Sequence, residues 1–211
     1  MPDLTVPGAG GVSAAGKGGR EPAVLRTQRL ELRAPDEHDV DALATLCQDS
    51  DVQRWTTVPA PYTREDAIRF ATIVVPAGWA DGTSLNWGVR LEDRLIGMGG
   101  LHRIGEGEAE LGYWLGREFR GRGLMAEAAR TILDYAFEVL RVQRVEWHAF
   151  VGNTASAAVA RRAGFRFEGT VRLGCVQRGR RVDDWQAGLL AEDPRAPAEG
   201  WPSETFPVSA R

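Results

Sequence analysis

Arginine and glycine residues crowd together ahead of a helical pattern at positions 117–125, which read REFRGRGLM. The first turn of a helix carries unpaired backbone N–H groups and a partial positive charge. Glycines let a ligand approach such a backbone closely, and arginines add charged hydrogen bonds. These residues can therefore bind the phosphate groups of a ligand, although a solvated basic turn would use the same residue types.

A dinucleotide-binding motif is a competing interpretation, because GRGLMA from Gly121 onward fits G-x-G-x-x-A. That fold places its first glycine directly after a buried, almost wholly apolar parallel strand. Here the preceding strand pattern carries Glu110, and residues 117–120 separate it from Gly121, so we disfavour this interpretation. A P-loop is excluded because no Gly-Lys-Ser/Thr follows the glycines.

Residue patterns in the first half of the chain predict a strand over residues 24–35 and helices over residues 37–48 and 64–75. They then predict three further strands, over residues 84–92, 94–104 and 108–116. Asp36 is the expected N-cap of the first helix, and Thr63 with Asp66 forms a capping box for the second. Pro76 should end or kink the second helix, because proline lacks an N–H and crowds the preceding turn. Tight turns join the last three strands and indicate an antiparallel meander.

The second half predicts a long helix, a strand, a shorter helix and a hairpin, over residues 124–140, 143–150, 154–163 and 165–191. Asn153 can cap the shorter helix, Gly164 can end it, and the hairpin turn lies near Gly179. The long helix crosses between two strands and makes them parallel. The predicted fold class is therefore α+β, a single domain whose central, mixed and mostly antiparallel sheet is flanked by helices.

The length of 211 residues favours one domain with tails, which we place at residues 23–192. Residues 1–22 are rich in Gly, Pro, Ala and Ser without a hydrophobic period, and this composition predicts a disordered N-terminal tail. Residues 193–211 are rich in proline and are predicted as a C-terminal tail, in which Trp201 and Phe206 could dock.

The net charge of −3 provides no general field for binding nucleic acid or an anionic membrane. Cys47 and Cys175 lie far apart and share no metal-ligand spacing with the histidines, so we expect reduced thiols and no metal site. His102 and His148 are expected to be structural. No signal-peptide core and no apolar stretch of about 18 residues is present, which predicts a soluble, cytoplasmic protein.

Three stretches together resemble a known superfamily: ELGYWLGREFRGRGLMAEA, then VGNTASAAVARRAGFRFEG, with LRTQRLELRAPDEHDVDAL nearer the start. They are similar to the GNAT superfamily of N-acetyltransferases, and within it to the RimJ/RimL type that acetylates the N-termini of ribosomal proteins. The likeness covers residues 24–192. It implies acetyl-CoA as cosubstrate and a primary amine as acceptor, either a protein N-terminus or a small molecule such as an amino acid, polyamine or antibiotic. A non-catalytic acyl-CoA-binding module is the alternative of another class, and a homodimer is kept as a candidate assembly.

The resemblance also implies a set of cofactor-binding residues. The family motif Q/R-x-x-G-x-G/A, which grips the pyrophosphate of acetyl-CoA, falls on residues 120–125, with methionine where the family has Gly or Ala. The strand before it would splay from its neighbour and pair with the pantetheine arm. The implied residues are Tyr113, Trp114, Leu115, Arg117, Arg120, Gly121, Arg122, Gly123, Leu124, Met125, Asn153 and Ser156.

For catalysis the resemblance implies an acid and a base. Ser156 would protonate the departing thiolate, and Glu168 would take a proton from the attacking amine, with Glu110 as the alternative base. Each residue also has a non-catalytic alternative. Ser156 could simply be the third residue of a capped helix, and either glutamate could be a solvated strand residue. Neither cysteine is placed to carry an acyl group, so the transfer is expected to be direct.

The acceptor pocket is the part of the site about which the sequence says least. We expect it to be built from variable loops such as residues 54–63. Trp55, Tyr62 and Trp87 are candidate lining residues, and core packing is the alternative for each.

Overall fold

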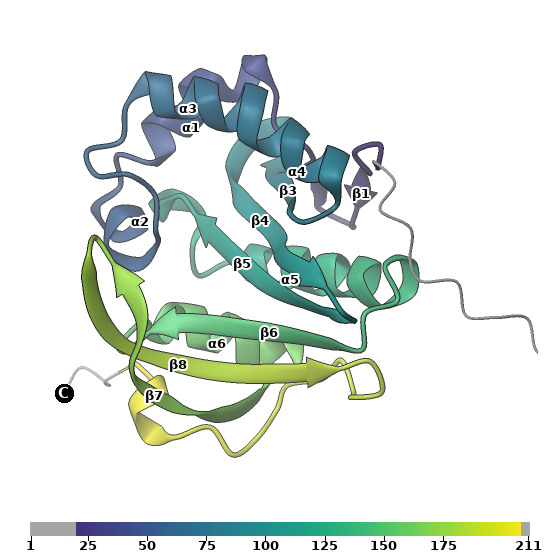
Figure 1. Ribbon diagram of the computed structural model, residues 1–211, viewed down its shortest axis with the longest axis vertical. Helices are drawn as coiled ribbons and strands as arrows, with labels where there is room; N and C mark the ends of the chain where they lie inside the picture. Colours follow the sequence, from purple (N-terminus) through teal and green to yellow (C-terminus); the bar gives the residue numbers. More distant parts are fainter. Residues whose placement is uncertain (1–19, 208–211) are drawn as a thin grey trace, which may run out of the picture.

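A computed structural model describes residues 20–207 of the chain. They form one eight-stranded sheet in the order β1-β2-β3-β4-β5-β6-β8-β7, with helices on both faces (Figure 1). The predicted α+β class and mixed sheet are confirmed. The tail predicted over residues 1–22 lies almost entirely outside the described residues.

The strands are β1 (Leu25–Arg26), β2 (Leu30–Arg33), β3 (Leu85–Leu91), β4 (Arg94–Gly105), β5 (Glu108–Leu115), β6 (Arg144–Phe150), β7 (Arg166–Gln177) and β8 (Arg180–Leu190). The α-helices are α1 (Val40–Leu46), α2 (Ser50–Trp55), α3 (Arg64–Arg69), α4 (Val75–Asp81), α5 (Leu124–Asp134) and α6 (Thr154–Ala163). Short 3-10 helices are η1 (Glu37–Asp39), η3 (Arg117–Phe119) and η5 (Ser203–Thr205), and π-helical turns are η2 (Phe70–Val74) and η4 (Tyr135–Val139). Within residues 20–207, no helix has both the length and the apolar character needed to cross a membrane.

The middle of the sheet is split. Strands β3, β4 and β5 form the predicted antiparallel meander, and β5 pairs in parallel with β6 after the crossover through α5. The parallel pairing covers only Glu108–Glu110 opposite Arg144–Glu146. Beyond it, β5 stays on β4 while β6 follows β8, and the two strands diverge (Figure 1). The β5 backbone after Glu110 is therefore free of a strand partner on the side of β6.

The strand predicted over residues 24–35 is instead a short hairpin of β1 and β2. The Thr27 hydroxyl accepts hydrogen bonds from the backbone N–H groups of Arg29, at 3.2 Å, and Leu30, at 2.8 Å. These bonds turn the chain, so that Leu25 pairs with Leu32. The prediction of one continuous strand was wrong, because a threonine side-chain turn does not disturb the alternation of apolar residues.

Pro76 shapes the second predicted helix without ending it. The helical segment passes from α3 through η2 to α4, and Pro76 lies in the first turn of α4. The wider π turn immediately before it accommodates the missing N–H and the bulk of the ring. The capping box of Thr63 and Asp66 and the caps of α6 by Asn153 and Gly164 are confirmed.

Two hydrophobic clusters hold the layers together. The larger lies between the sheet and helices α4, α5 and α6, and the smaller joins α1, α2 and α3 to β4 through Leu95 and Met98. Helix α5 packs very close to the sheet, since a Cβ on Gly99 would lie 2.7 Å from Ile132 Cδ1. The start of α5 is thereby fixed relative to the split in the sheet.

The C-terminal segment packs on the domain. Trp201 is buried against Trp147 and Phe167, and its indole N–H donates a hydrogen bond of 2.9 Å to the Phe165 carbonyl. The guanidinium of Arg161 lies 3.9 Å from the centre of the exposed Phe206 ring. The tail predicted from residue 193 is thus held against α6 as far as this ring.

Candidate active site

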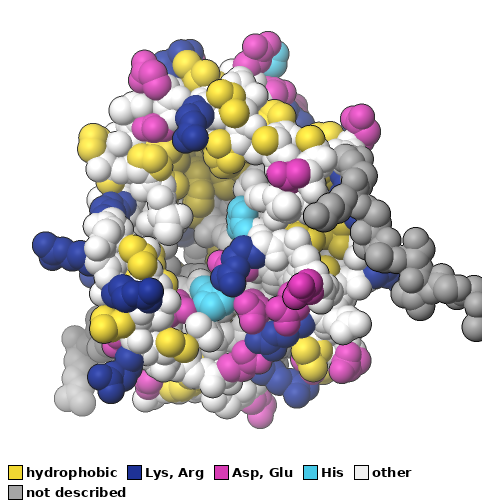
Figure 2. All heavy atoms as spheres, in the orientation of Figure 1, with side chains coloured by type: hydrophobic (Ala, Val, Ile, Leu, Met, Phe, Trp, Pro, Cys, Tyr) yellow, Lys and Arg dark blue, Asp and Glu magenta, His cyan; other side chains and the backbone are white. Residues whose placement is uncertain are grey.

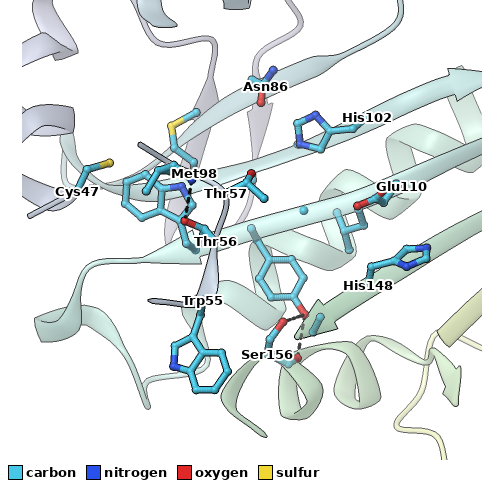
Figure 3. Close-up of a pocket in the computed structure, with 18 of the residues that line it drawn as sticks. Cys47, Trp55, Thr56, Thr57, Asn86, Met98, His102, Glu110, His148 and Ser156 are labelled. Carbon is cyan, nitrogen blue, oxygen red and sulfur yellow. Dashed lines mark hydrogen bonds between the residues drawn. The ribbon is translucent and has the colours of Figure 1, made fainter. Parts of the chain in front are cut away.

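Two cavities lie next to each other where the sheet splits. Figure 2 shows the hollowed face of the molecule, and Figure 3 shows residues that line the larger cavity. The loop cavity, of about 370 Å³, runs between the end of β5, residues 119–126 and the start of α6. The sheet cavity, of about 490 Å³, lies over β4, β5 and β6 under the segment 55–59 and the hairpin of β7 and β8. Both are lined by Trp55, Thr56, Tyr113, Trp114, Asn153 and Ser156.

The glycines of the predicted phosphate loop take the backbone shape that the loop requires. Gly121 and Gly123 both have φ +75°, in the left-handed region that favours glycine. Gly123 is the N-cap residue of α5 and offers no side chain to cap the helix. The first N–H groups of α5 therefore remain available to a ligand in the loop cavity.

Arg120 is held by the protein itself. Its Nε donates to the Leu115 carbonyl at 2.9 Å, and its two terminal nitrogens lie 2.7 Å and 2.9 Å from carboxylate oxygens of Asp49 and Asp51 at the start of α2. Arg117 approaches the same carboxylates at 3.7 Å and 3.8 Å. The sequence motif suggested a direct phosphate contact for the Arg120 side chain, but in the structure this side chain fixes the loop to β5 and α2.

A second set of polar contacts holds the other side of the loop. The Arg29 guanidinium pairs with Glu127 in the first turn of α5 and donates a 3.2 Å hydrogen bond to the Arg122 carbonyl. Thr27 also donates to Glu127, and the hydrogen bonds from Thr27 and Arg29 outweigh burial and lower the pKa of this carboxyl. Among residues 20–207, Arg122 has no carboxylate within ion-pair distance. Arg122 is thus the loop arginine without a carboxylate partner there, and it lies outside the residues that line the loop cavity.

Ser156 lies at the wall between the two cavities, in the first turn of α6. Asn153 caps that helix by accepting a 3.1 Å hydrogen bond from the Ser156 N–H. The Ser156 hydroxyl, labelled in Figure 3, accepts from the Trp147 indole at 3.1 Å and donates to the Tyr113 hydroxyl at 3.3 Å. Tyr113 in turn donates to the Ser156 carbonyl at 2.9 Å. Burial raises the pKa of Tyr113 and keeps the phenol protonated.

Glu168, the preferred base in the sequence analysis, lies outside the residues that line either cavity. Its two carboxylate oxygens accept hydrogen bonds of 2.6 Å and 2.8 Å from Arg144. These bonds lower the pKa of Glu168. The register of β7 causes this placement, since Arg166 lies opposite Gly188 and brings Glu168 near Arg144 on β6. The structure therefore gives no support to Glu168 as a base.

Three titratable side chains from adjacent strands line the sheet cavity instead (Figure 3). His102 on β4 lies opposite Glu110 on β5, and His148 follows on β6. His102 Nδ1 lies 3.0 Å from the Ser84 hydroxyl, and burial lowers the pKa of this imidazole. His148 is bonded to Asp184 at 2.7 Å, and this bond raises the pKa of His148. Glu110, the alternative base, is thus positioned in a cavity.

Comparison with known proteins decides the family. The model of the acetyltransferase (GNAT) domain matches residues 29–166. This chain belongs to the GNAT family of acetyltransferases. The uncharacterized N-acetyltransferase p20 of Bacillus licheniformis is 31% identical over 175 residues, which are 80% of this chain and 97% of p20. The Bacillus subtilis protein named "Putative ribosomal N-acetyltransferase YdaF" is 39% identical over 117 residues, which are 54% of this chain and 64% of YdaF, less than two thirds of its length.

The fold of this N-acetyltransferase matches solved structures of the same kind. A structure described as RimL, the ribosomal L7/L12 alpha-N-protein acetyltransferase in complex with coenzyme A, superposes with a TM-score of 0.72. It is 25% identical, and the match covers 80% of this chain and 98% of that chain. The resemblance to RimJ/RimL-type enzymes is confirmed, together with the GNAT fold and the N-acetyltransferase class.

The residues of this acetyltransferase fit a CoA molecule. A Cβ on Gly121 would meet no atom within 4 Å, and one on Gly123 would meet only the Arg29 side chain, at 3.9 Å, so space beside the loop is open. The free edge of β5 supplies amide groups for an extended amide chain. Met125, the departure from the family motif, is buried and lines the loop cavity together with Leu124.

The sheet cavity of the acetyltransferase includes only part of the expected acceptor pocket. Trp55 and Tyr62 line it, whereas Trp87 is fully buried and donates its indole N–H to the Ala23 carbonyl. Both cysteines also line this cavity, and burial raises the pKa of Cys47 to about 12 and that of Cys175 to about 11. Both thiols therefore stay protonated at neutral pH. Within residues 20–207 no cluster of His, Cys, Asp and Glu is arranged to hold a metal ion.

Sequence reasoning missed the groups that position the site. Asp49 and Asp51 look like ordinary helix-start residues in the pattern Asp-Ser-Asp, and only their tertiary contact with Arg120 gives them a further role. His148 and Asp184 lie on different strands, 36 positions apart in the sequence. The alternation of β6 could have indicated that His148 shares a face with Glu146, but not that a buried carboxylate lies beside it.

Proposed function

We propose that this protein transfers the acetyl group of acetyl-CoA directly to the α-amino group at the N-terminus of a polypeptide. The observation that carries the proposal is the meeting of the two cavities at the Tyr113 and Ser156 pair. One cavity has the features needed for an acyl-CoA, and the other has carboxylates and imidazoles suited to an amine. The two substrates would then react at the shared wall.

The loop cavity would orient acetyl-CoA through backbone groups. The N–H groups at Gly121, Gly123 and the start of α5 would bind the pyrophosphate, with the Arg122 guanidinium as a charged donor. The free edge of β5 around Tyr113, Trp114 and Leu115 would pair with the pantetheine amides. This placement brings the thioester toward the shared wall.

Ser156 is the proposed acid. Its hydroxyl accepts a hydrogen bond from Trp147 and donates one to the Tyr113 hydroxyl, and it would turn toward the CoA thiolate to protonate it. An alkyl thiol has a pKa of about 8.5, so protonation of the leaving group assists its departure near neutral pH.

The sheet cavity attracts an ammonium group. Glu110 has 26% of its side chain exposed and pairs only loosely with the exposed Arg103, at 3.3 Å. It is therefore available to bind an amine that enters the cavity. In this proposal Glu110 holds the acceptor, and Glu168 takes no part.

The protein N-terminus is favoured over a small amine by the relatives. YdaF has the name "Putative ribosomal N-acetyltransferase", and the RimL structure is described as an alpha-N-protein acetyltransferase. The volume of about 490 Å³ is also enough for the first residues of a chain. A small-molecule amine is the alternative outcome of the test.

The test is an acceptor screen in which mass spectrometry detects the gain of one acetyl group and a thiol reagent detects released CoA. The panel contains peptides with free N-termini, the same peptides with blocked N-termini, and amino acids, polyamines and aminoglycosides. We expect acetyl gain on free N-termini and none on the matched blocked peptides. Transfer to small amines alone would refute the polypeptide acceptor, and CoA binding without transfer to any amine would favour a non-catalytic module.

A further inference from the structure

A histidine and a buried carboxylate form a pair beside the proposed amine site. Asp184 on β8 is 1% exposed, and its Oδ2 lies 2.7 Å from His148 Nδ1 on β6. Both residues line the sheet cavity (Figure 3 labels His148). The mechanism described above uses neither of them.

Burial makes His148 the charge partner of Asp184. An unpaired buried carboxylate is strongly destabilising. Besides His148, the hydrogen-bond donor to Oδ2 is the neutral amide of Gln186, at 3.1 Å, while Oδ1 has no N–H or O–H partner among residues 20–207. No Arg or Lys within the described chain forms an ion pair with this carboxylate. The proton of the imidazole is therefore placed on Nδ1, toward Asp184.

The other ring nitrogen is left with a weak contact. His148 Nε2 lies 3.4 Å from Glu146, longer than the bond on the Nδ1 side, and 22% of the side chain is exposed. In the neutral tautomer with Nδ1 protonated, Nε2 carries the lone pair, and the contact with the Glu146 carboxylate becomes a hydrogen bond only when Nε2 takes up a proton. His148 lines the sheet cavity, and in this tautomer Nε2 is the ring nitrogen that can accept a proton.

We propose that His148 accepts the proton of the incoming ammonium group at Nε2, and that Asp184 is the positioning residue that fixes the ring and its tautomer. The inference rests on the proposed function. It distinguishes two roles at the amine site: Glu110 binds the ammonium group, and His148 deprotonates it, directly or through one water.

The acid–base match favours the imidazole over a carboxylate. An α-amino group has a pKa of about 7.7–8.0, an unperturbed glutamate about 4.3 and an unperturbed histidine about 6.5. Proton transfer to a base is most efficient when its pKa lies near the working pH. The hydrogen bond to Asp184 outweighs burial and raises the pKa of His148, toward that of the amine.

Several charged groups surround this imidazole and contribute to its titration. Strands β5, β6, β7 and β8 bring the side chains of Glu110, Arg144, Glu146, Glu168, Cys175 and Asp184. The carboxylates stabilise the imidazolium. Arg144 opposes them only in part, because it is already paired with Glu146 and Glu168.

The reaction balances with these groups. The ammonium gives one proton to His148 Nε2, and the nitrogen lone pair then forms a bond to the thioester carbonyl carbon while the carbon–sulfur bond breaks. The thiolate receives a proton from the Ser156 hydroxyl, which is reprotonated by the proton that the nitrogen loses on becoming an amide. His148 releases its proton to solvent, so that one proton leaves for each acetyl group transferred.

The test is the pH profile of kcat at saturating substrates, which reports groups in the ternary complex. His148→Gln should lower kcat by about 100-fold or more and abolish the acidic limb, with the KM for acetyl-CoA unchanged. Asp184→Asn should move that limb to lower pH. His102→Gln, the matched control in the same cavity, should keep the limb at its wild-type position. An acidic limb that persists in His148→Gln would overturn the inference and leave the acetyl transfer itself intact.

NMR titration of the histidine rings in the intact wild-type protein provides a readout that does not depend on the fold of a variant. We expect His148 to titrate above the unperturbed value of about 6.5 and His102 below it. A His148 ring that titrates below that value would overturn the inference even if Asp184→Asn fails to fold. If wild type transfers acetyl to no amine, the proposed function fails, and the proton-acceptor role fails with it.

Discussion

Replacement of Gly121 by alanine should affect the stability of the protein and its affinity for CoA to different extents. Gly121 has φ +75°, and an added Cβ would meet no protein atom within 4 Å. The substitution therefore costs only the strain of a left-handed residue, about 1 kcal/mol. For a domain of this size that loss lowers the melting temperature by about 2–4 °C.

The effect on CoA should be much larger. If the pyrophosphate occupies the open space beside Gly121, the new methyl group blocks its approach to the backbone N–H. Loss of one hydrogen bond to a charged group costs about 1.5–3 kcal/mol, which weakens binding roughly 10- to 150-fold. Isothermal titration with CoA measures this loss, and calorimetric unfolding measures the strain.

Gly82→Ala is the matched control. Gly82 ends α4 with φ +73°, and a Cβ there would also meet nothing within 4 Å. It lines neither cavity, so the variant should lose the same stability and keep the wild-type Kd for CoA. Equal CoA affinities in Gly121→Ala and Gly82→Ala would refute the placement of phosphate at the loop.

Three further predictions concern side chains. Glu168→Gln should leave kcat/KM unchanged and lower the free energy of unfolding by at most about 1 kcal/mol, because the pair with Arg144 is partly exposed. A 100-fold fall in kcat/KM would show that Glu168 takes part in the reaction. Trp201→Ala should lower the free energy of unfolding in urea by about 3–5 kcal/mol, and a loss below about 1 kcal/mol would contradict the docking of this segment. The raised pKa of His148 means that its pairing stabilises the protein fully below the unfolded pKa of about 6.5 and loses this effect as pH rises through the folded value. The stability difference between wild type and His148→Gln should therefore shrink from about pH 6 to pH 9, and a difference that grows would show the opposite sign of the shift.

Local patterns in the sequence predict most of the fold. Helix caps at Thr63 and Asn153, the turn at Gly179 and the alternation of the meander all depend on residues close together in the chain. The family resemblance implied that β5 and β6 separate. The alternation of apolar and polar residues does not indicate this, because nothing in either strand marks where the pairing of β5 with β6 ends.

The roles of charged residues in the site depend on contacts between residues far apart in the chain, which the sequence does not reveal. The family resemblance favours Glu168 over Glu110 as the base, but β7 places Glu168 against Arg144. The same holds for Arg120, whose motif position indicates phosphate while the structure pairs it with Asp49 on another helix. A charged side chain can be assigned to a ligand only after its partners within the protein are known.

The split sheet also leaves a strand edge free inside the domain. A free strand edge on the periphery of a protein can pair with any other chain and promotes aggregation. Here the free edge of β5 borders a cavity of about 370 Å³ that residues 119–126 and the start of α6 also line. The hydrogen bonds that an ordinary sheet would make while folding are thus kept for a ligand in this cavity.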